Sequence, residues 1–203
     1  MIKNIVFDWS GTLADDLATT YKATMHIFEK LGGKPMPLEE YREKFFLPYM
    51  DFWKKYFPNC TNEQVANFFR EGLQMAGDSE LYPEVKNVLK RLYDRGIKMV
   101  VMSSGPQEKI IADAQKHGIF DYFKEINGNI LDKTEAIADI LQRNDFRSEE
   151  TMCIGDMNHD IEAGKKVGVT SVGISWGHKS KEMLKTSNPD YLISDIAELE
   201  QLL

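Results

Sequence analysis

Short apolar runs alternate with stretches of helical periodicity from about residue 81 onward. Runs typical of buried strands cover residues 2–7, 98–102, 151–154, 171–174 and 191–193. Helical spacing or helix-capping signals predict helices over residues 83–95, 106–117, 133 onward, 158–167 and 194–203. This alternation is the signature of βαβ units. The pattern therefore predicts an α/β fold with a parallel sheet covered by helices.

The stretch from about residue 15 to residue 80 lacks this alternation and predicts helices only. Its last predicted helix begins at Thr61, and Gln64 three residues later completes a capping box. The organisation expected is a catalytic core of residues 1–14 and 82–203 with a helical cap of residues 15–81. Aromatic residues at helical spacing are expected to form the cap's own core; they are Phe45, Phe46, Tyr49, Phe52, Trp53, Tyr56 and Phe57.

Composition and charge narrow the class of protein. The chain has 203 residues, of which 42% are hydrophobic and 28% charged, as is ordinary for a globular protein. The net charge of -7, without a basic stripe, disfavours binding to nucleic acid. No apolar stretch approaches the about 18 residues of a membrane span, and no signal-peptide pattern opens the chain. We expect a cytoplasmic protein that binds no membrane; oligomeric state is not predicted.

Acidic residues follow two of the predicted strands. Asp8 comes directly after the first strand, with Gly11 in the turn behind it, and is a candidate nucleophile. Asp156 and Asp160 follow the strand 151–154 and are four residues apart, so a helix opening at Asn158 turns both to one side. In parallel sheets, ligands bind at the carboxyl ends of the strands, where these residues fall. Like charges brought together favour a cation.

Mg²⁺ is the cation expected, because it prefers oxygen ligands and shares them with a phosphate. The direct ligands predicted are Asp8, the backbone carbonyl of Ser10 and Asp156. Asp160 is expected either to bind the ion directly or to lie in its second coordination sphere. Lys133, at the start of a predicted helix, is expected to pair with Asp8 and with the phosphate.

A turn after the strand 98–102 supplies a candidate phosphate site. Ser103 offers a hydroxyl, and the backbone N–H groups of Ser104 and Gly105 open toward a helix N-terminus. Together with the acids and the lysine, these residues indicate phosphoryl transfer to Asp8. His178 and Lys179 follow another strand and are expected in an exposed loop, with the mouth of the site as the alternative.

The segments Asp8-Trp9-Ser10-Gly11-Thr12, Ser103, Lys133 and Gly155 through Asp160 resemble the four motifs of the haloacid dehalogenase-like hydrolase superfamily. The chain is similar to the branch with a helical cap after the first motif, which includes phosphoglycolate phosphatase-like proteins. The resemblance covers nearly the whole chain. It implies a Rossmann-like sheet, a cap that closes over Asp8, and a Mg²⁺-dependent phosphatase whose partner is a small phosphorylated metabolite, a phosphate monoester.

Ser10 departs from the family's pattern, in which an aspartate two residues after the nucleophile acts as general acid and base. Loss of a positioned acid/base removes about 10²–10⁴-fold in rate, so the resemblance implies slow turnover. Ser10 is similar to the threonine of transport ATPases of this superfamily, which favours a long-lived phosphoenzyme. His159 is an alternative proton donor.

Two other functions remain open at this point. The first motif is also similar to that of phosphonoacetaldehyde hydrolases, which break a carbon–phosphorus bond through a cap lysine; Lys44, Lys54 and Lys55 are the candidates. Such a lysine requires desolvation, whereas a solvated helix face is the ordinary interpretation of these charges. The other possibility is a non-enzymatic phosphoryl-binding or switch protein, which Ser10 keeps open.

Overall fold

The computed structural model describes residues 1–203 and divides them into two compact units. The first, which we call the core unit, consists of Met1–Asp15 and Leu81–Leu203. The second, the helical unit, is Asp16–Glu80. None of the helices combines the length and the apolar character needed to cross a membrane.

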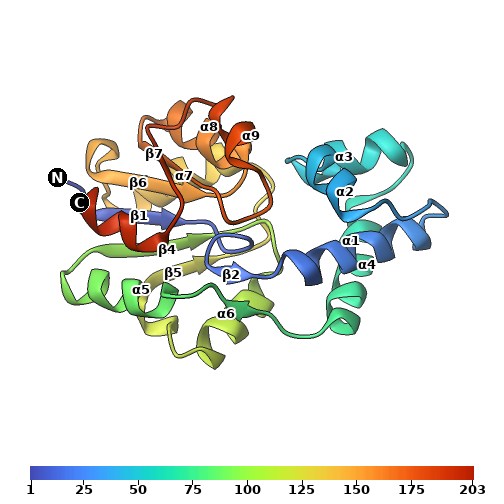
Figure 1. Ribbon diagram of the computed structural model, residues 1–203, viewed down its shortest axis with the longest axis horizontal. Coiled ribbons are helices and arrows are strands. Elements are labelled where there is room, and N and C mark those ends of the chain that lie inside the picture. The colour runs from blue at the N-terminus through green and yellow to red at the C-terminus, as the bar shows by residue number, and fades with distance from the viewer. The chain divides into compact units, whose positions relative to one another are not determined.

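A six-stranded parallel sheet forms the centre of the core unit, in the order β5-β4-β1-β6-β7-β8 (Figure 1). The predicted α/β fold with a Rossmann-like parallel sheet is confirmed. The strands are β1 (Asn4–Phe7), β4 (Lys98–Met102), β5 (Phe123–Asn127), β6 (Thr151–Gly155), β7 (Thr170–Ile174) and β8 (Tyr191–Ile193). β1 lies between β4 and β6 and is buried along its whole length, as its continuous apolar run predicts.

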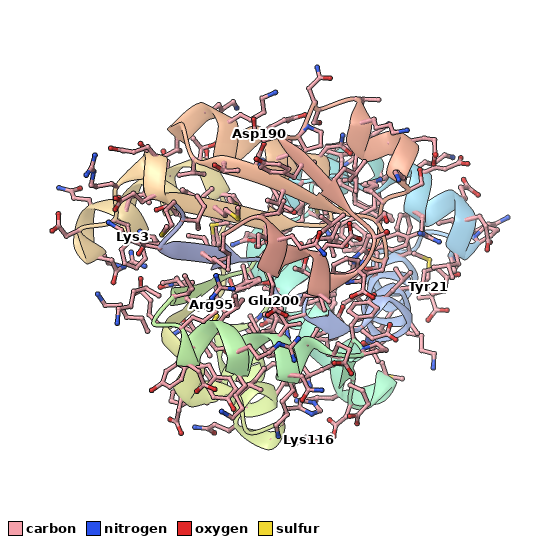
Figure 2. The ribbon with its side chains drawn as sticks, turned by 60° about the vertical axis from the view of Figure 1, so that its left-hand side comes forward. Lys3, Tyr21, Arg95, Lys116, Asp190 and Glu200 are labelled. Carbon is pink, nitrogen blue, oxygen red and sulfur yellow. The ribbon has the colours of Figure 1, made fainter.

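Successive residues of β1 point to opposite faces of the sheet, and each face has its own layer of helices. Ile5 and Phe7 pack with apolar residues of α5 (Val85–Asp94), α6 (Gln107–Lys116) and the 3-10 helix η3 (Ile196–Gln201). Val6 packs on the other face with α7 (Lys133–Asn144) and α8 (Asn158–Val167). Glu200 on η3 (Figure 2) also pairs with Arg91 of α5 at 2.7 Å.

The structure differs from the sequence pattern at three places in the core unit. The edge strand β5 was not predicted, because Lys124 and Glu125 interrupt its apolar residues. The helix predicted over residues 194–203 is wrong in type, since η3 is a 3-10 helix that begins at Ile196. The short helix α9 (Lys181–Lys185) was not predicted either. The other short 3-10 helices are η1 (Phe120–Tyr122) and η2 (Ser148–Glu150).

Four helices make up the helical unit: α1 (Leu17–Lys30), α2 (Leu38–Lys44), α3 (Tyr49–Tyr56) and α4 (Asn62–Ala76). The predicted capping box of α4 is present, with reciprocal hydrogen bonds of 3.0 and 3.2 Å between Thr61 and Gln64. The hydroxyl of Tyr21 (Figure 2) donates to the carbonyl of Met36 at 2.7 Å. The unit's own core is aromatic, as predicted, with Phe28, Phe52 and Trp53 at its centre.

The chain leaves and re-enters the core through two very short strands. β2 (Ala14–Asp15) pairs with β3 (Glu80–Leu81) in a separate two-stranded sheet. The two ends of the intervening segment are therefore held side by side.

Gly72 tests the packing inside the helical unit, because a β-carbon there would lie 2.6 Å from the Cα of Ala23 on α1. We expect Gly72→Val to force α1 and α4 apart and to lower the free energy of unfolding by about 1–3 kcal/mol. Urea denaturation measures the loss. Met75→Val is the control, since Met75 lies on the same helix and is 76% exposed. Equal stability of the two variants would contradict the tight packing of α1 on α4.

Candidate functional site

Asp8 lies at the carboxyl end of β1, and its side chain is buried. Its backbone N–H donates to the carbonyl of Ile154 at 2.8 Å, which extends the β1–β6 pairing by one residue. The chain then turns sharply, and the carbonyl of Trp9 accepts hydrogen bonds from the backbone N–H groups of residues 12–14. The hydroxyl of Thr12 lies 3.4 Å from Asp8 Oδ2. The first strand and its turn therefore hold a carboxylate at the carboxyl end of the parallel strands.

Asp156 and Asp160 reach the same point from β6 and α8. Asp8, Asp156 and Asp160 each have one carboxylate oxygen within 4.8 Å of those of the other two. All three residues are buried. Asp160 is fixed by a hydrogen bond of 3.0 Å from the backbone N–H of Met157 to its Oδ2. The expected convergence of the three acidic side chains is thus present in the structure.

Lys133 lies between two of these carboxylates and is itself 1% exposed. It opens α7, whose N-terminus is capped by Asp132 through hydrogen bonds of 2.7 and 3.3 Å. Its Nζ donates to Asp8 Oδ1 at 2.9 Å and to Asp160 Oδ1 at 2.5 Å. Burial by itself lowers the pKa of this ammonium group, but the attraction of Asp160 and Asp8 outweighs burial and raises the pKa above its usual range. Lys133 is therefore charged.

One lysine does not balance three buried carboxylates. Burial, with smaller contributions from Asp160 and Asp156, raises the pKa of Asp8 to about 8 against the opposing effect of Lys133. In addition, Asp156 Oδ1 is buried and has no hydrogen-bond partner. Three neighbouring carboxyl groups, an unpartnered oxygen and an all-oxygen donor set suit a hard divalent cation. The cluster fits a metal ion.

Asp156 is also held by a residue that the sequence pattern assigned to an exposed loop. The backbone N–H of His178 donates to Asp156 Oδ2 at 2.6 Å, and its ring Nδ1 lies 2.7 Å from the same oxygen. Burial raises the pKa of Asp156, but the charge and hydrogen bonds of His178, with Lys133, lower it below its usual value. Since His178 and Lys179 are only 6% and 4% exposed, the prediction of an exposed loop is wrong.

The turn after β4 has a different arrangement from the one expected. Ser103 is buried at the end of the strand, and its Oγ accepts a hydrogen bond from Gly105 N–H at 3.2 Å. The Gly105 N–H is therefore engaged by Ser103 rather than open as predicted. The adjacent Ser104 is half-buried. The hydroxyl of Ser103 remains the candidate hydrogen-bond donor to a bound phosphate group in this turn.

The remaining candidates occupy contrasting environments. Ser10 is half-buried and forms a β-bridge with Ala14 inside the turn after Asp8. His159, in the first turn of α8, has a buried Nδ1 without a partner, and burial lowers the pKa of its ring. In the helical unit, Lys54 and Lys55 are exposed. They lack the desolvation that a Schiff-base lysine requires.

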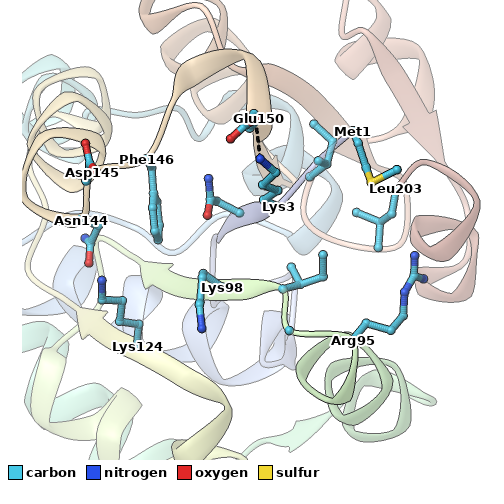
Figure 3. A pocket seen from close by; sticks show the side chains of 14 residues that line it. Met1, Lys3, Arg95, Lys98, Lys124, Asn144, Asp145, Phe146, Glu150 and Leu203 are labelled. Carbon is cyan, nitrogen blue, oxygen red and sulfur yellow. Dashed lines mark hydrogen bonds and ion pairs between the residues drawn. The ribbon is translucent and has the colours of Figure 1, made fainter.

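A hollow of about 560 Å³ opens at the opposite edge of the sheet (Figure 3). Its lining includes Lys3 and Lys98, which stand at the amino ends of β1 and β4. Lys3 is paired there with Glu150 at 2.7 Å. None of the candidate catalytic residues lines it, and ligands of parallel α/β sheets bind at the carboxyl ends. The acidic cluster is therefore the candidate active site.

Comparison with known proteins agrees with this geometry. The family model described as haloacid dehalogenase-like hydrolase matches residues 5–174, which include Asp8, Ser103, Lys133 and both acids of the last motif. The chain belongs to the haloacid dehalogenase-like hydrolase family. The resemblance inferred from the motifs is thus confirmed.

Relatives with curated names are phosphatases of several kinds. A phosphoglycolate phosphatase from Synechococcus elongatus is 25% identical, over 97% of this chain and 95% of its own length. A 5'-nucleotidase from Pseudomonas aeruginosa is 27% identical, over 98% and 95% respectively. The crystal structure of a predicted phosphatase from Clostridium acetobutylicum shares the fold, with a TM-score of 0.87 at 21% identity over 100% of this chain and 98% of that one. The chain is an enzyme, a phosphatase of this family.

Lys133→Met tests the electrostatic role of the lysine. The substitution leaves Asp8 and Asp160 buried without their counter-charge, so we expect the free energy of unfolding to fall by about 3 kcal/mol or more. Chemical denaturation without divalent cations measures the effect. Lys90→Met is the matched control, because Lys90 pairs with Asp94 at the surface, where ion pairs contribute little. A Lys133 variant as stable as this control would contradict a buried ion pair.

Proposed function

We propose that the protein is a Mg²⁺-dependent phosphatase of small phosphate monoesters that works through an aspartyl-phosphate at Asp8. The observation that carries the proposal is the meeting of Asp8, Asp156 and Asp160 with Lys133 in a buried cluster. A nucleophilic carboxylate, a fixed positive charge and an oxygen site for a cation are what phosphoryl transfer to an aspartate requires.

The cation site draws on residues from two segments. Asp8, the Ser10 carbonyl and Asp156 are the proposed ligands, and Asp160 either binds directly or acts through its bond to Lys133. A bound Mg²⁺ would neutralise charge on the phosphoryl oxygens. Its positive charge would also keep Asp8 ionised for attack, since a nearby positive charge favours the carboxylate form.

The two chemical steps use this chain's own groups. A carboxylate oxygen of Asp8 forms a bond to phosphorus, and the bond from phosphorus to the alcohol oxygen breaks. The leaving oxygen keeps the electron pair of that bond and takes up a proton from water. Water then attacks the same phosphorus, releases inorganic phosphate and restores the carboxylate. Lys133 and the Ser103 hydroxyl stabilise charge on the phosphoryl group.

Ser10 determines the speed of these steps. A hydroxyl two residues after the nucleophile does not exchange protons as a carboxyl group does near neutral pH. Protonation of the leaving alcohol and activation of water are then both unassisted. The phosphoenzyme accumulates, and substrates with good leaving groups react fastest.

The helical unit supplies the proposed cap, with the core formed by residues 1–14 and 82–203 and the cap by residues 15–81. A cap over such a site excludes water from the reacting phosphorus. The substrate class rests on the relatives, whose names include phosphoglycolate phosphatase and 5'-nucleotidase. Exposure of Lys54 and Lys55 favours ester hydrolysis over cleavage of a carbon–phosphorus bond.

Phosphate release from a panel of small monoesters tests the proposed reaction. We expect release that depends on Mg²⁺, stops on addition of a chelator, and is lost in Asp8→Asn, which keeps the size of the side chain but removes the nucleophile. Residual release from Asp8→Asn equal to that of the wild type would exclude the aspartyl-phosphate.

Ser10→Asp tests the explanation for slow turnover. Restoring an acid/base at this position is expected to raise the rate of phosphoenzyme breakdown by at least about tenfold, and by more for poor leaving groups. Rapid-quench kinetics separates the initial burst from the steady state. Ser10→Asn is the matched control, since it has the same shape without the titratable group. If both variants turn over like the wild type, protonation at position 10 does not limit the reaction.

A further inference from the structure

The loop after β7 and the turn after β1 both approach one oxygen of Asp156 closely. A β-carbon at Gly177 would lie 2.3 Å from Asp156 Oδ2, and one at Gly11 would lie 2.1 Å from the same atom. Gly11 also has a positive φ of 70°, which L side chains rarely adopt. The loop is tied to the turn after β1 by Trp176, whose Nε1 donates to the Thr12 carbonyl at 3.1 Å. The backbone of both glycines therefore approaches Oδ2 too closely to admit a side chain.

His178 places two hydrogen-bond donors against Oδ2 of Asp156. An ionised carboxylate only accepts hydrogen bonds, so the ring nitrogen 2.7 Å from Asp156 Oδ2 carries the proton and donates it. The backbone N–H of His178 donates to the same oxygen at 2.6 Å. Oδ2 therefore has two short hydrogen bonds, while Oδ1 of the same carboxylate has no partner.

We infer that His178 is a positioning residue for the metal site, which fixes the rotamer of Asp156 so that Oδ1 is the oxygen presented to the cation. Removing a group that orients a metal ligand in this way typically lowers metal affinity by about 10–100-fold. The inference rests on the proposed function, because it presumes a cation at the Asp8–Asp156 cluster. It adds which oxygen binds and what holds it.

The position of the donor atom distinguishes this role from simple packing. The side-chain amide of asparagine places an N–H near the position of the histidine Nδ1, whereas that of glutamine reaches one bond further. His178→Asn is therefore expected to keep the hydrogen bond to Asp156. His178→Gln and His178→Leu are expected to lose it, while the backbone donor stays in all three.

Binding of Mn²⁺, which shares the oxygen preference of Mg²⁺, is the measurement. Free Mn²⁺ is followed by electron paramagnetic resonance during titration of the full chain without substrate. We expect His178→Leu and His178→Gln to bind about tenfold or more weakly than the wild type, and His178→Asn within about threefold of it. His117→Asn, at the C-terminal end of α6, is the control and is expected to bind like the wild type.

The outcomes separate the inference from the function on which it rests. If the wild type binds Mn²⁺ no better than Asp156→Ala, both the cation site and the inference are overturned. If the wild type binds and all His178 variants bind equally well, only the inference is overturned. His178→Asn binding as weakly as His178→Gln also overturns it, because the Nδ1 donor is then not the cause. Should the leucine variant not fold, the asparagine and glutamine pair still decides.

Discussion

The ion pair between Lys133 and two carboxylates is the constraint on which the rest of the site depends. Its Nζ contacts Asp8 and Asp160 at 2.9 and 2.5 Å, with almost no exposure of any partner. Removing such charges from water costs several kcal/mol, which good geometry and further hydrogen bonds must offset. The sheet meets this requirement by ending β1 and β6 side by side, and α7 brings the lysine in from one face. The arrangement of the strands and α7 therefore determines the electrostatics of the site.

Glycine residues make the crowding possible. A β-carbon at Gly155 would lie 2.3 Å from Cγ of Asp160, and Gly11 and Gly177 are equally close to Asp156. Two of these three glycines stand in the motifs next to the acidic residues themselves. They provide room rather than flexibility, because close approach of the backbone is what lets three carboxylates share one buried volume. Chemistry and packing thus select the same short segments of sequence.

Much of the fold is encoded locally. The strands β1, β4 and β6 contain continuous apolar runs because helices cover both faces of the sheet, and such runs are visible in the sequence. β5 is an edge strand whose polar residues hide it, and η3 fits the helical pattern without forming an α-helix. Motif order places Asp8, Lys133, Asp156 and Asp160 at one edge, as the structure does. The position of His178 depends on a contact with Asp156, 22 residues earlier in the chain, which no local pattern contains.

The short β2–β3 pair has a consequence for how the chain diversifies. Because Ala14–Asp15 and Glu80–Leu81 are paired, the 16–80 segment begins and ends at neighbouring points of the core. The entropic cost of closing a loop rises only slowly with its length. The inserted segment also has an aromatic core of its own, so its length or sequence can change without disturbing the other unit's core. The proposed nucleophile Asp8, Lys133 and the other two acids all belong to the other unit. Changes in the length or sequence of the insertion therefore leave the residues of the acidic cluster in place.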